Sequence, residues 1–254
     1  MKFVILGNGS IGQRHAANLR ALRPEAEIIT ADPRGNATHR DWRVALDIPG
    51  EITGVLICSP HDAHLEQIEA VNALGLPIFC EKPLWTIAQT ADGLALAERV
   101  SVPFAMGFQY RFHDAFETIP SQVRLTFIGG DYLTYRYGLT VAETMTSHAI
   151  DLALQRLGLA EEVRFETDGI ILAGEIVHQG GCCSAFNYDM ECDFKISRIQ
   201  WRYGSLELPK NNAAYVNELQ AWLTLLDGGL RNPRLATLAD AVAVQKVMAQ
   251  CKAY

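Results

Sequence analysis

A glycine-rich turn near the start of the chain has the residue types and spacing that hold a dinucleotide. It follows a short apolar segment, 2–6, and opens a segment with helical periodicity, 11–22. In a G-x-G-x-x-G turn the first glycine allows the tight bend, the second lets the backbone approach a pyrophosphate, and the third allows close packing of helix on strand. The residues of this turn are Gly7, Asn8, Gly9, Ser10, Ile11 and Gly12. Amide groups at the start of the helix would then face the anion.

An acidic residue, Asp32, ends a second strand-like segment, 27–31. A carboxylate at this place accepts hydrogen bonds from the adenosine ribose hydroxyls and repels a 2′-phosphate, which favours NAD over NADP. Arg34 stands two positions later, and an arginine at such a turn pairs with that phosphate. We therefore expect NAD as the cofactor, with NADP as an open alternative.

Two short polar motifs follow later strand-like segments. Ser59-Pro60 comes after the third segment and Glu81-Lys82-Pro83 after the fourth. Because ligands bind outside the carboxyl ends of the strands in open α/β sheets, both motifs are expected at the ligand edge. Lys82 taken alone is more readily interpreted as a surface cation.

The elements that must position these motifs alternate over the first hundred or so residues. We expect strands at 2–6, 27–31, 53–58, 77–80 and 102–107, and helices at 11–22, 63–74 and 87–99. Short apolar strands separated by helices indicate βαβ units and a parallel sheet with helices on both faces. The sequence therefore predicts an α/β fold, with a doubly wound Rossmann domain over residues 1–118.

After about residue 120 the pattern changes to consecutive strands separated by Gly or Asp turns. Strands are expected at 122–128, 131–137, 162–166, 170–178, 182–188, 192–199 and 199–208, and helices at 147–157, 213–226 and 235–251. Ser147 is placed to cap the first of these helices and Gly158 to end it. Runs of strands after βα units predict an α+β domain with a mainly antiparallel open sheet over residues 119–254.

Charge and hydropathy favour a small-molecule ligand. The 254 residues include 22 basic and 29 acidic ones, a formal charge of −7, without a Lys/Arg run, which disfavours nucleic acid and an anionic membrane as partners. The apolar start is too short for a signal peptide, and no segment approaches the ~20 apolar residues that span a bilayer. We expect a soluble, cytoplasmic protein.

The cysteines indicate no metal or disulfide framework. The adjacent Cys182 and Cys183 would point to opposite faces of a strand, and scattered cysteines in apolar runs are typical of buried, reduced thiols. A zinc site built from Cys182, Cys192 and His178 is an alternative without a recognised spacing. We expect no metal.

Four segments occur in a characteristic order and spacing, and together they resemble one family. They are G-N-G-S-I-G-Q-R-H from residue 7, S-P-H-D-A-H at 59–64, E-K-P-L at 81–84 and G-F-Q-Y-R-F at 107–112. The chain in this way resembles the Gfo/Idh/MocA (glucose–fructose oxidoreductase / inositol dehydrogenase) family of NAD(P)-dependent oxidoreductases. The resemblance is specific over residues 1–113 and looser through S-H-A-I-D-L at 147–152 and Y-V-N-E-L-Q-A-W-L near the end. It implies a sugar-like or polyol substrate and a homo-oligomer, a dimer or tetramer.

The resemblance also implies roles for matching residues around the cofactor. Ser59, Pro60 and His64 would line the nicotinamide side, with Glu81 and Lys82 beside them. Lys82 would relay the proton of the substrate hydroxyl, aimed by a cis peptide before the following proline.

In the second domain the resemblance implies that His148 and Asp151 bound the substrate pocket, and it places Tyr110 and Arg111 at the domain junction. His148 and Asp151 are three residues apart and share a face of a helix. Without the resemblance they read as an ordinary helix-start histidine and a surface aspartate.

Two features depart from the family pattern. Family members usually carry an aspartate three or four residues before the histidine, where this chain has Thr144 and Met145, so that Glu143, Asp151 or the substrate itself would take its place. Family members are also typically longer than this chain, which implies a trimmed second domain.

The remaining histidines are interpreted as polar surface or helix-edge residues rather than ligands: His15, His39, His61, His113 and His178.

The function that these features favour is reversible hydride transfer between a nicotinamide and a carbon bearing a secondary hydroxyl. Lys82 accepts the hydroxyl proton if burial or positive charge lowers its pKa, and His148 holds or assists the hydroxyl. Three alternatives stay open: a dinucleotide-binding protein without turnover, an NAD-assisted elimination or hydrolysis, and a metal-dependent enzyme built on the cysteine-rich strands.

Overall fold

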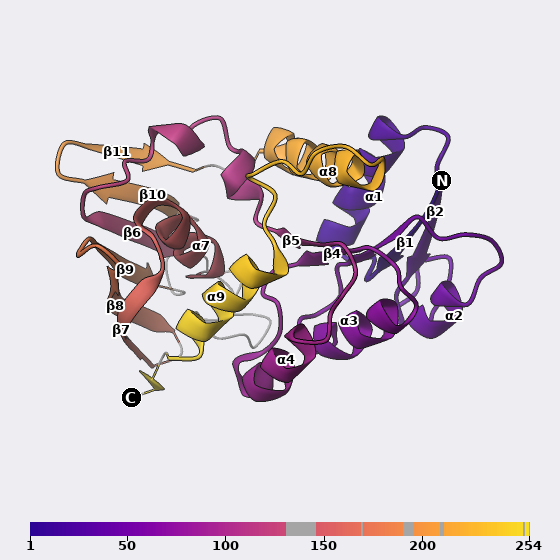
Figure 1. Cartoon of the computed structure of the whole chain (residues 1–254), viewed down its shortest axis with the longest axis horizontal. Coiled ribbons are helices and arrows are strands. Elements are labelled where there is room, and N and C mark those ends of the chain that lie inside the picture. Colours follow the sequence, from indigo (N-terminus) through magenta and orange to yellow (C-terminus); the bar gives the residue numbers. More distant parts are fainter. Residues whose placement is uncertain (131–145, 169, 190–195, 209–210, 251, 254) are drawn as a thin grey trace. The chain divides into compact units, whose positions relative to one another are not determined.

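The computed structural model describes residues 1–130, 146–168, 170–189, 196–208, 211–250 and 252–253, and the chain forms two compact units (Figure 1). The first unit consists of Met1–Phe112 with Asn212–Ala239, and the second of His113–Asn211 with Asp240–Tyr254. The single boundary expected near residue 118 therefore differs from these units, because the segment from 212 to 239 returns to the first one. The assignment of the units to cofactor and substrate stays a prediction.

The first unit is built on a five-stranded, wholly parallel sheet. Its strands are β1 (Lys2–Leu6), β2 (Glu27–Ala31), β3 (Gly54–Ile57), β4 (Ile78–Glu81) and β5 (Phe104–Gly107). They lie in the order β2-β1-β3-β4-β5, so that the chain reverses its direction across the sheet between β1 and β3. Every residue of β3, β4 and β5 is buried, as expected for strands covered on both faces. The predicted Rossmann sheet is confirmed.

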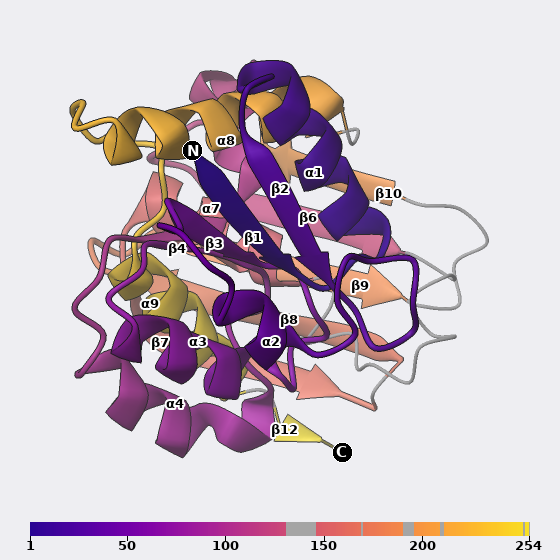
Figure 2. The ribbon, with the colours of Figure 1, turned by 90° about the vertical axis from the view of Figure 1, so that its right-hand side faces the viewer.

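Helices cover both faces of this sheet, with α1 and α8 on one side and α2, α3 and α4 on the other (Figures 1 and 2). Their bounds are α1 Ser10–Leu22, α2 Trp42–Leu46, α3 His64–Ala73, α4 Thr90–Ala97 and α8 Asn212–Leu226. The helix expected at 87–99 is divided into a 3-10 turn, η1 (Ile87–Gln89), and α4, and a capping box of Thr86 and Gln89 closes the start of η1. The short α2, capped by the Asp41 side chain, was not expected from the sequence.

Trp222 on α8 explains why this late helix belongs to the first unit. The indole is fully buried and packs on Phe3 of β1 and Phe79 of β4, with ring centroids 6.0 and 5.6 Å away. A side chain on Gly54 of β3 would approach the indole to 2.8 Å, so the ring sits directly on the strand backbone. Burial of so large an apolar side chain holds α8 on the sheet.

The second unit carries a seven-stranded sheet in the order β11-β10-β6-β9-β8-β7-β12. Its strands are β6 (Leu125–Gly130), β7 (Ala160–Thr167), β8 (Ile171–His178), β9 (Cys183–Asp189), β10 (Ile196–Trp201), β11 (Gly204–Glu207) and β12 (Lys252–Ala253). Only β6 with β9 and β7 with β12 pair in parallel among these described strands, which confirms a mainly antiparallel sheet. The single strand expected at 199–208 is wrong, because β10 and β11 form a hairpin there. The strand expected at 131–137 lies outside the described residues.

Two helices complete the second unit, α7 (Thr146–Leu157), which packs against β9, and α9 (Leu238–Met248). The prediction that Ser147 caps α7 is wrong: the helix already includes Ser147, whose buried hydroxyl has no hydrogen-bond partner among the residues described. Gly158 ends the helix as expected, with φ of +94° and its N–H donated to the carbonyl of Leu154. A short 3-10 turn, η3 (Phe116–Thr118), precedes β6. No helix within the described ranges is long and apolar enough to cross a membrane.

Replacement of Trp222 by alanine is expected to lower the free energy of unfolding by ~3–5 kcal/mol, because the cavity would lie at the centre of the first unit's core. Urea denaturation followed by circular dichroism measures the change. Leu230→Ala is the control, since that leucine is 94% exposed and its loss should cost less than ~0.5 kcal/mol. Equal losses in the two variants would contradict the assigned packing.

Candidate functional site

The glycine turn after β1 touches the end of β3, and the contact leaves no room for side chains. Gly7 has φ of +95°, and a Cβ there would come within 2.5 Å of the Ser59 amide nitrogen. A Cβ on Gly12 would lie 2.0 Å from the carbonyl oxygen of Gly7. Both positions therefore require glycine, one for its backbone conformation and both for the close approach.

Gly9 differs from these two glycines, because it borders open space. Among the described atoms, a Cβ on Gly9 would meet only the Arg34 guanidinium, at 3.4 Å. Helix α1 starts immediately afterwards with no side-chain cap and no acidic residue in its first turn. Its first amide groups are thus not satisfied by a capping side chain, as an anion site at a helix N-terminus requires. The arrangement fits the pyrophosphate of a dinucleotide.

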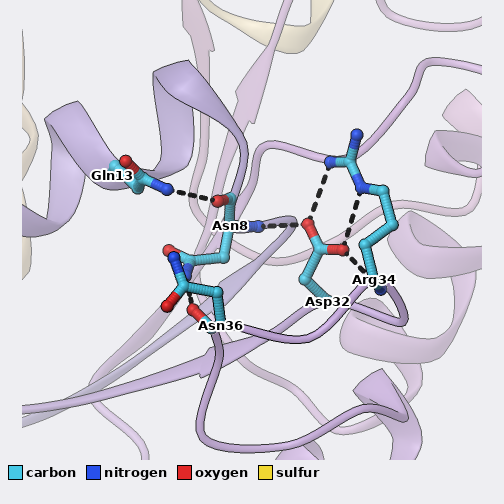
Figure 3. A network of polar contacts seen from close by, with 5 residues as sticks. All are labelled: Asn8, Gln13, Asp32, Arg34 and Asn36. Atoms are coloured by element: carbon cyan, nitrogen blue, oxygen red, sulfur yellow. Dashed lines mark hydrogen bonds and ion pairs between the residues drawn. The ribbon is translucent and has the colours of Figure 1, made fainter.

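Asp32 lies next to this turn, at the end of β2, and joins it through hydrogen bonds (Figure 3). Its Oδ2 accepts from the Asn8 amide at 2.9 Å and from Nη2 of Arg34 at 3.0 Å. Its Oδ1 accepts from the amide and Nε of Arg34 at 2.9 and 3.1 Å. The aspartate is 3% exposed, whereas the Arg34 side chain is 72% exposed, so that the arginine reaches back from solvent onto a buried carboxylate.

These contacts hold Asp32 ionised. The hydrogen bond from the Arg34 side chain outweighs the opposing effect of burial, and with the amides of Arg34 and Asn8 it lowers the pKa of the Asp32 carboxyl to about 2. Asn8 is braced on its other side, where its carbonyl accepts from Gln13 at 3.0 Å and its side-chain amide donates to the Asn36 carbonyl. A buried, ionised carboxylate is thus hydrogen-bonded to the turn at Asn8 and paired with Arg34.

His64 at the start of α3 ties the ends of β3 and β4 together. Its Nε2 lies 2.9 Å from the Ser59 carbonyl and its Nδ1 lies 2.9 Å from the Pro83 carbonyl. Burial lowers the pKa of His64, and a neutral imidazole donates from one nitrogen only. The ring therefore donates to one of the two carbonyls and contacts the other, while the Ser59 hydroxyl donates to Gln67 at 2.6 Å.

Lys82 follows β4 and is half-buried, and its peptide bond to Pro83 is cis, as the family resemblance implied. The preceding Glu81 is 5% exposed. Its Oε1 lies 2.7 Å from Nε2 of His15, and its Oε2 accepts from the Lys82 amide at 3.3 Å. The immediate neighbour of Lys82 is therefore a buried carboxylate, and not the positive charge that was expected to lower the pKa of the lysine.

Three of the histidines assigned to the surface or to helix edges are in fact buried: His15, His61 and His178. His178 lies 2.7 Å from the Gly158 carbonyl and 2.8 Å from the Ser184 hydroxyl, which occupies both of its ring nitrogens. His15 lies on the buried face of α1. It follows Gly12 by three residues and so shares the helix face that packs against the sheet, which is the signal in the sequence that could have indicated its burial.

Tyr110 and Arg111 lie in the 3-10 turn η2 (Gln109–Phe112), directly after β5. Both are buried, at 7% and 1% exposure, and the Arg111 guanidinium lies 5.7 Å from the centre of the Phe108 ring. His148 and Asp151 lie in the first turns of α7 in the second unit, at 9% and 1% exposure.

The structure brings the cofactor-site candidates together at one edge of the first sheet. The glycine turn, Asp32, the Ser59 loop and the Glu81–Lys82 loop all follow the carboxyl ends of strands around the reversal between β1 and β3, where open α/β sheets bind ligands. The association of Lys82 with the His148 and Asp151 pair stays a prediction. Glu143, Thr144 and Met145 lie outside the described residues.

Within the described ranges, no group of three or more His, Cys, Asp or Glu side chains could hold a metal ion. Of the alternative zinc ligands, Cys192 lies outside those ranges.

Comparison with known proteins agrees with this geometry. Residues 1–108 match the model of the Gfo/Idh/MocA oxidoreductase family with an NAD-binding Rossmann fold. The rhizopine catabolism protein MocA of Rhizobium meliloti is 31% identical over 139 residues, 51% of this chain and 44% of that protein. The inositol 2-dehydrogenase of Paracoccus denitrificans is 31% identical over 138 residues, 48% of this chain and 41% of that protein. The matched region thus spans less than half the length of these relatives.

A solved structure extends the similarity in fold to the second unit. The WlbA (WbpB) dehydrogenase from Thermus thermophilus, in complex with NAD and UDP-GlcNAcA, superposes with a TM-score of 0.78 over 98% of this chain and 94% of that chain. Their sequence identity is 16%, so the likeness concerns the fold alone.

Asp32→Asn is expected to lower the free energy of unfolding at neutral pH and to lose this effect in acid. Because the folded-state pKa of Asp32 is depressed from 3.8 to about 2, the ionised carboxylate stabilises the protein fully above pH 5 or so, and this advantage disappears as pH falls towards 2. Urea denaturation at pH 6 and pH 3 measures the difference. The exposed Asp62→Asn should show none, and a pH-independent loss in Asp32→Asn would contradict the assignment.

Proposed function

The chain belongs to the Gfo/Idh/MocA family of oxidoreductases by its residues 1–108, and on this premise we propose that it is an NAD(P)-dependent dehydrogenase. The reaction is hydride transfer between the nicotinamide and a secondary hydroxyl or keto carbon of a sugar, polyol or sugar derivative. The observation that carries this proposal is the open glycine turn beside the ionised Asp32 at the strand reversal of the sheet.

In the proposed site the backbone of the turn holds the pyrophosphate. The amide groups that follow Gly9 point along the start of α1, where the helix dipole favours negative charge. The Asp32 carboxylate accepts hydrogen bonds from the ribose hydroxyls after the Arg34 guanidinium releases one or both of its hydrogen bonds to that carboxylate. The loops that His64 ties together, after β3 and β4, border the nicotinamide.

The bound nicotinamide supplies the hydride acceptor or donor, and Lys82 handles the proton. A side chain ending in an ammonium or amine at this edge gives a proton to a keto oxygen or takes one from a hydroxyl, depending on its charge state. His148 and Asp151 share one face of α7 and orient the hydroxyls of the substrate, together with Tyr110 and Arg111.

The chemical class of the substrate is inferred from the relatives. A polyol fits the name of the inositol 2-dehydrogenase, and a nucleotide-linked sugar fits the UDP-GlcNAcA complex of the structural relative. Both carry secondary hydroxyls, which is the group that the proposed reaction needs. A cytoplasmic location and a dimer or tetramer stay predictions.

A second candidate is a dinucleotide-binding protein without turnover. It is favoured by one observation, the occupation of the family's usual aspartate positions by Thr144 and Met145, neither of which accepts a proton. Cofactor binding without reaction across a panel of inositols, keto-sugars and nucleotide sugars would favour this candidate.

The wild-type protein is expected to bind NADH more tightly than NADPH. Asp32→Ala should weaken NADH binding by roughly 10-fold or more, because a hydrogen bond to a charged group contributes about 1.5–3 kcal/mol. Arg34→Ala should weaken NADPH more than NADH, because the guanidinium pairs with the 2′-phosphate. Isothermal titration calorimetry measures the affinity of each of the three proteins for both dinucleotides.

Arg99→Ala is the matched control, since this arginine is comparably exposed at 64% and also pairs with an acidic residue, Glu69. It should change neither affinity. Tighter binding of NADPH by the wild type would overturn the preference for NAD.

Lys82→Ala is expected to reduce turnover by roughly 10²–10⁴, the usual contribution of a positioned acid–base group, while dinucleotide affinity stays near the wild-type value. His148→Ala should cost less if the histidine only orients substrate. Steady-state kinetics on the best substrate of the panel gives both numbers, with the exposed Lys246→Ala as control. Wild-type turnover in Lys82→Ala would remove Lys82 from the mechanism.

A further inference from the structure

His15 and Glu81 form a buried pair that joins α1 to the residue before Lys82. The His15 side chain has no exposed surface, the Glu81 side chain has 7%, and Nε2 lies 2.7 Å from Oε1. The other ring nitrogen, Nδ1, has no hydrogen-bond partner among the described residues. Because a carboxylate oxygen can only accept, Nε2 is the donor of this hydrogen bond.

Packing holds both members of the pair in place. The His15 ring meets the rings of Phe79 and Tyr215 edge-on, at centroid distances of 5.2 and 6.0 Å. The Glu81 carboxyl group lies against β5, where a Cβ on Gly107 would approach it to 3.1 Å. The ring and the carboxylate thus lack alternative positions, and Oε2 remains on the amide of Lys82.

The carboxylate keeps its charge despite this burial. Burial raises the pKa of the Glu81 carboxyl, but the hydrogen bond and charge of His15, the charge of Lys82 and the Lys82 amide together outweigh it, and the pKa lies below its ordinary value. A buried ionised carboxylate is stable only when it is paired and hydrogen-bonded. His15 provides this pairing from an element far from Glu81 in the sequence.

The other titratable groups around Glu81 come from several elements, and none of them adds a second negative charge beside the carboxylate. They are Cys58 after β3, Cys80 on β4, His64 on α3 and Tyr215 on α8. Burial first, and the Glu81 carboxylate second, raise the pKa of both thiols and of the Tyr215 phenol, so these groups stay neutral. The pKa of His64 is lowered by burial. Beyond its contact with His15, the carboxylate is stabilised by the charge of Lys82.

We propose that His15 and Glu81 are positioning residues that keep Lys82 protonated at neutral pH, and so make it a proton donor. Opposite charges in close proximity stabilise each other's ionised forms. In the reducing direction the keto oxygen takes the ammonium proton while the carbon receives hydride, and water reprotonates the resulting amine. Oxidation needs the amine first and therefore increases as pH rises. The catalytic consequence rests on the proposed function, whereas the coupling of the three side chains does not.

The charge state of Lys82 is measured without any substrate. The chain has six lysines, and in protein labelled with ¹³C at lysine Cε the Lys82 signal is identified by its loss in Lys82→Arg. Its midpoint is followed by NMR as pH rises. Glu81→Gln, which keeps the shape and removes the charge, should lower the midpoint by about one unit or more.

His15 is tested by a pair of substitutions. His15→Leu leaves the carboxylate without its donor, so that Glu81 takes up a proton and the Lys82 midpoint falls as in Glu81→Gln. His15→Gln offers an amide N–H near the place of Nε2 and should restore a midpoint close to that of the wild type. His178→Leu, the loss of an equally buried histidine in the other unit, should leave the midpoint unchanged.

The outcomes separate the inference from the proposed function. An unchanged Lys82 midpoint in folded Glu81→Gln overturns the inference, whatever the enzyme does. A lowered midpoint supports the coupling even if no substrate reacts, and absence of any reaction then counts against the proposed function alone. With a reactive substrate, the acid limb of the oxidation profile in Glu81→Gln should move to lower pH by the same amount as the NMR midpoint.

Discussion

The contact between the glycine turn after β1 and the end of β3 is the constraint on which the site depends. Side chains at Gly7 or Gly12 would collide with backbone atoms of Ser59 or of the turn itself, so the two strand ends come together only with glycine at both positions. Because of this approach, the start of α1, Asp32 and the Ser59 loop lie next to one another at the carboxyl ends of β1, β2 and β3. It also leaves the space next to Gly9 open, on the side where an anion would meet the helix.

Charge at this sheet edge is arranged in pairs that are partly or fully buried. Asp32 is held ionised by Arg34 and by the amide of Asn8, and Glu81 by His15 and Lys82. Asp32 directly follows β2, and Glu81 is the last residue of β4. Removing the partner of either carboxylate would leave that carboxylate buried without its pairing charge, which is more costly than never having formed the pair.

The late helix α8 shows how the chain supports this edge from a distance. Trp222 covers β1, β3 and β4, and Tyr215 on the same helix packs against the His15 ring. A segment more than 100 residues beyond β5 thus completes both the core of the first unit and the wall of the His15–Glu81 pair. Loss of this helix packing would remove the support of the His15 ring, which contacts the carboxylate next to Lys82.

The sequence by itself determined the five parallel strands, most of the helices and the dinucleotide turn, because period, glycine spacing and the acidic end of β2 are local signals that neighbouring residues carry. It also indicated a second, mainly antiparallel sheet. Tertiary structure alone decided that α8 joins the first unit. It likewise buried His15 against Glu81, a partner 66 positions away. Such pairings depend on which faces meet when the sheet is covered, and no local pattern along the chain specifies that.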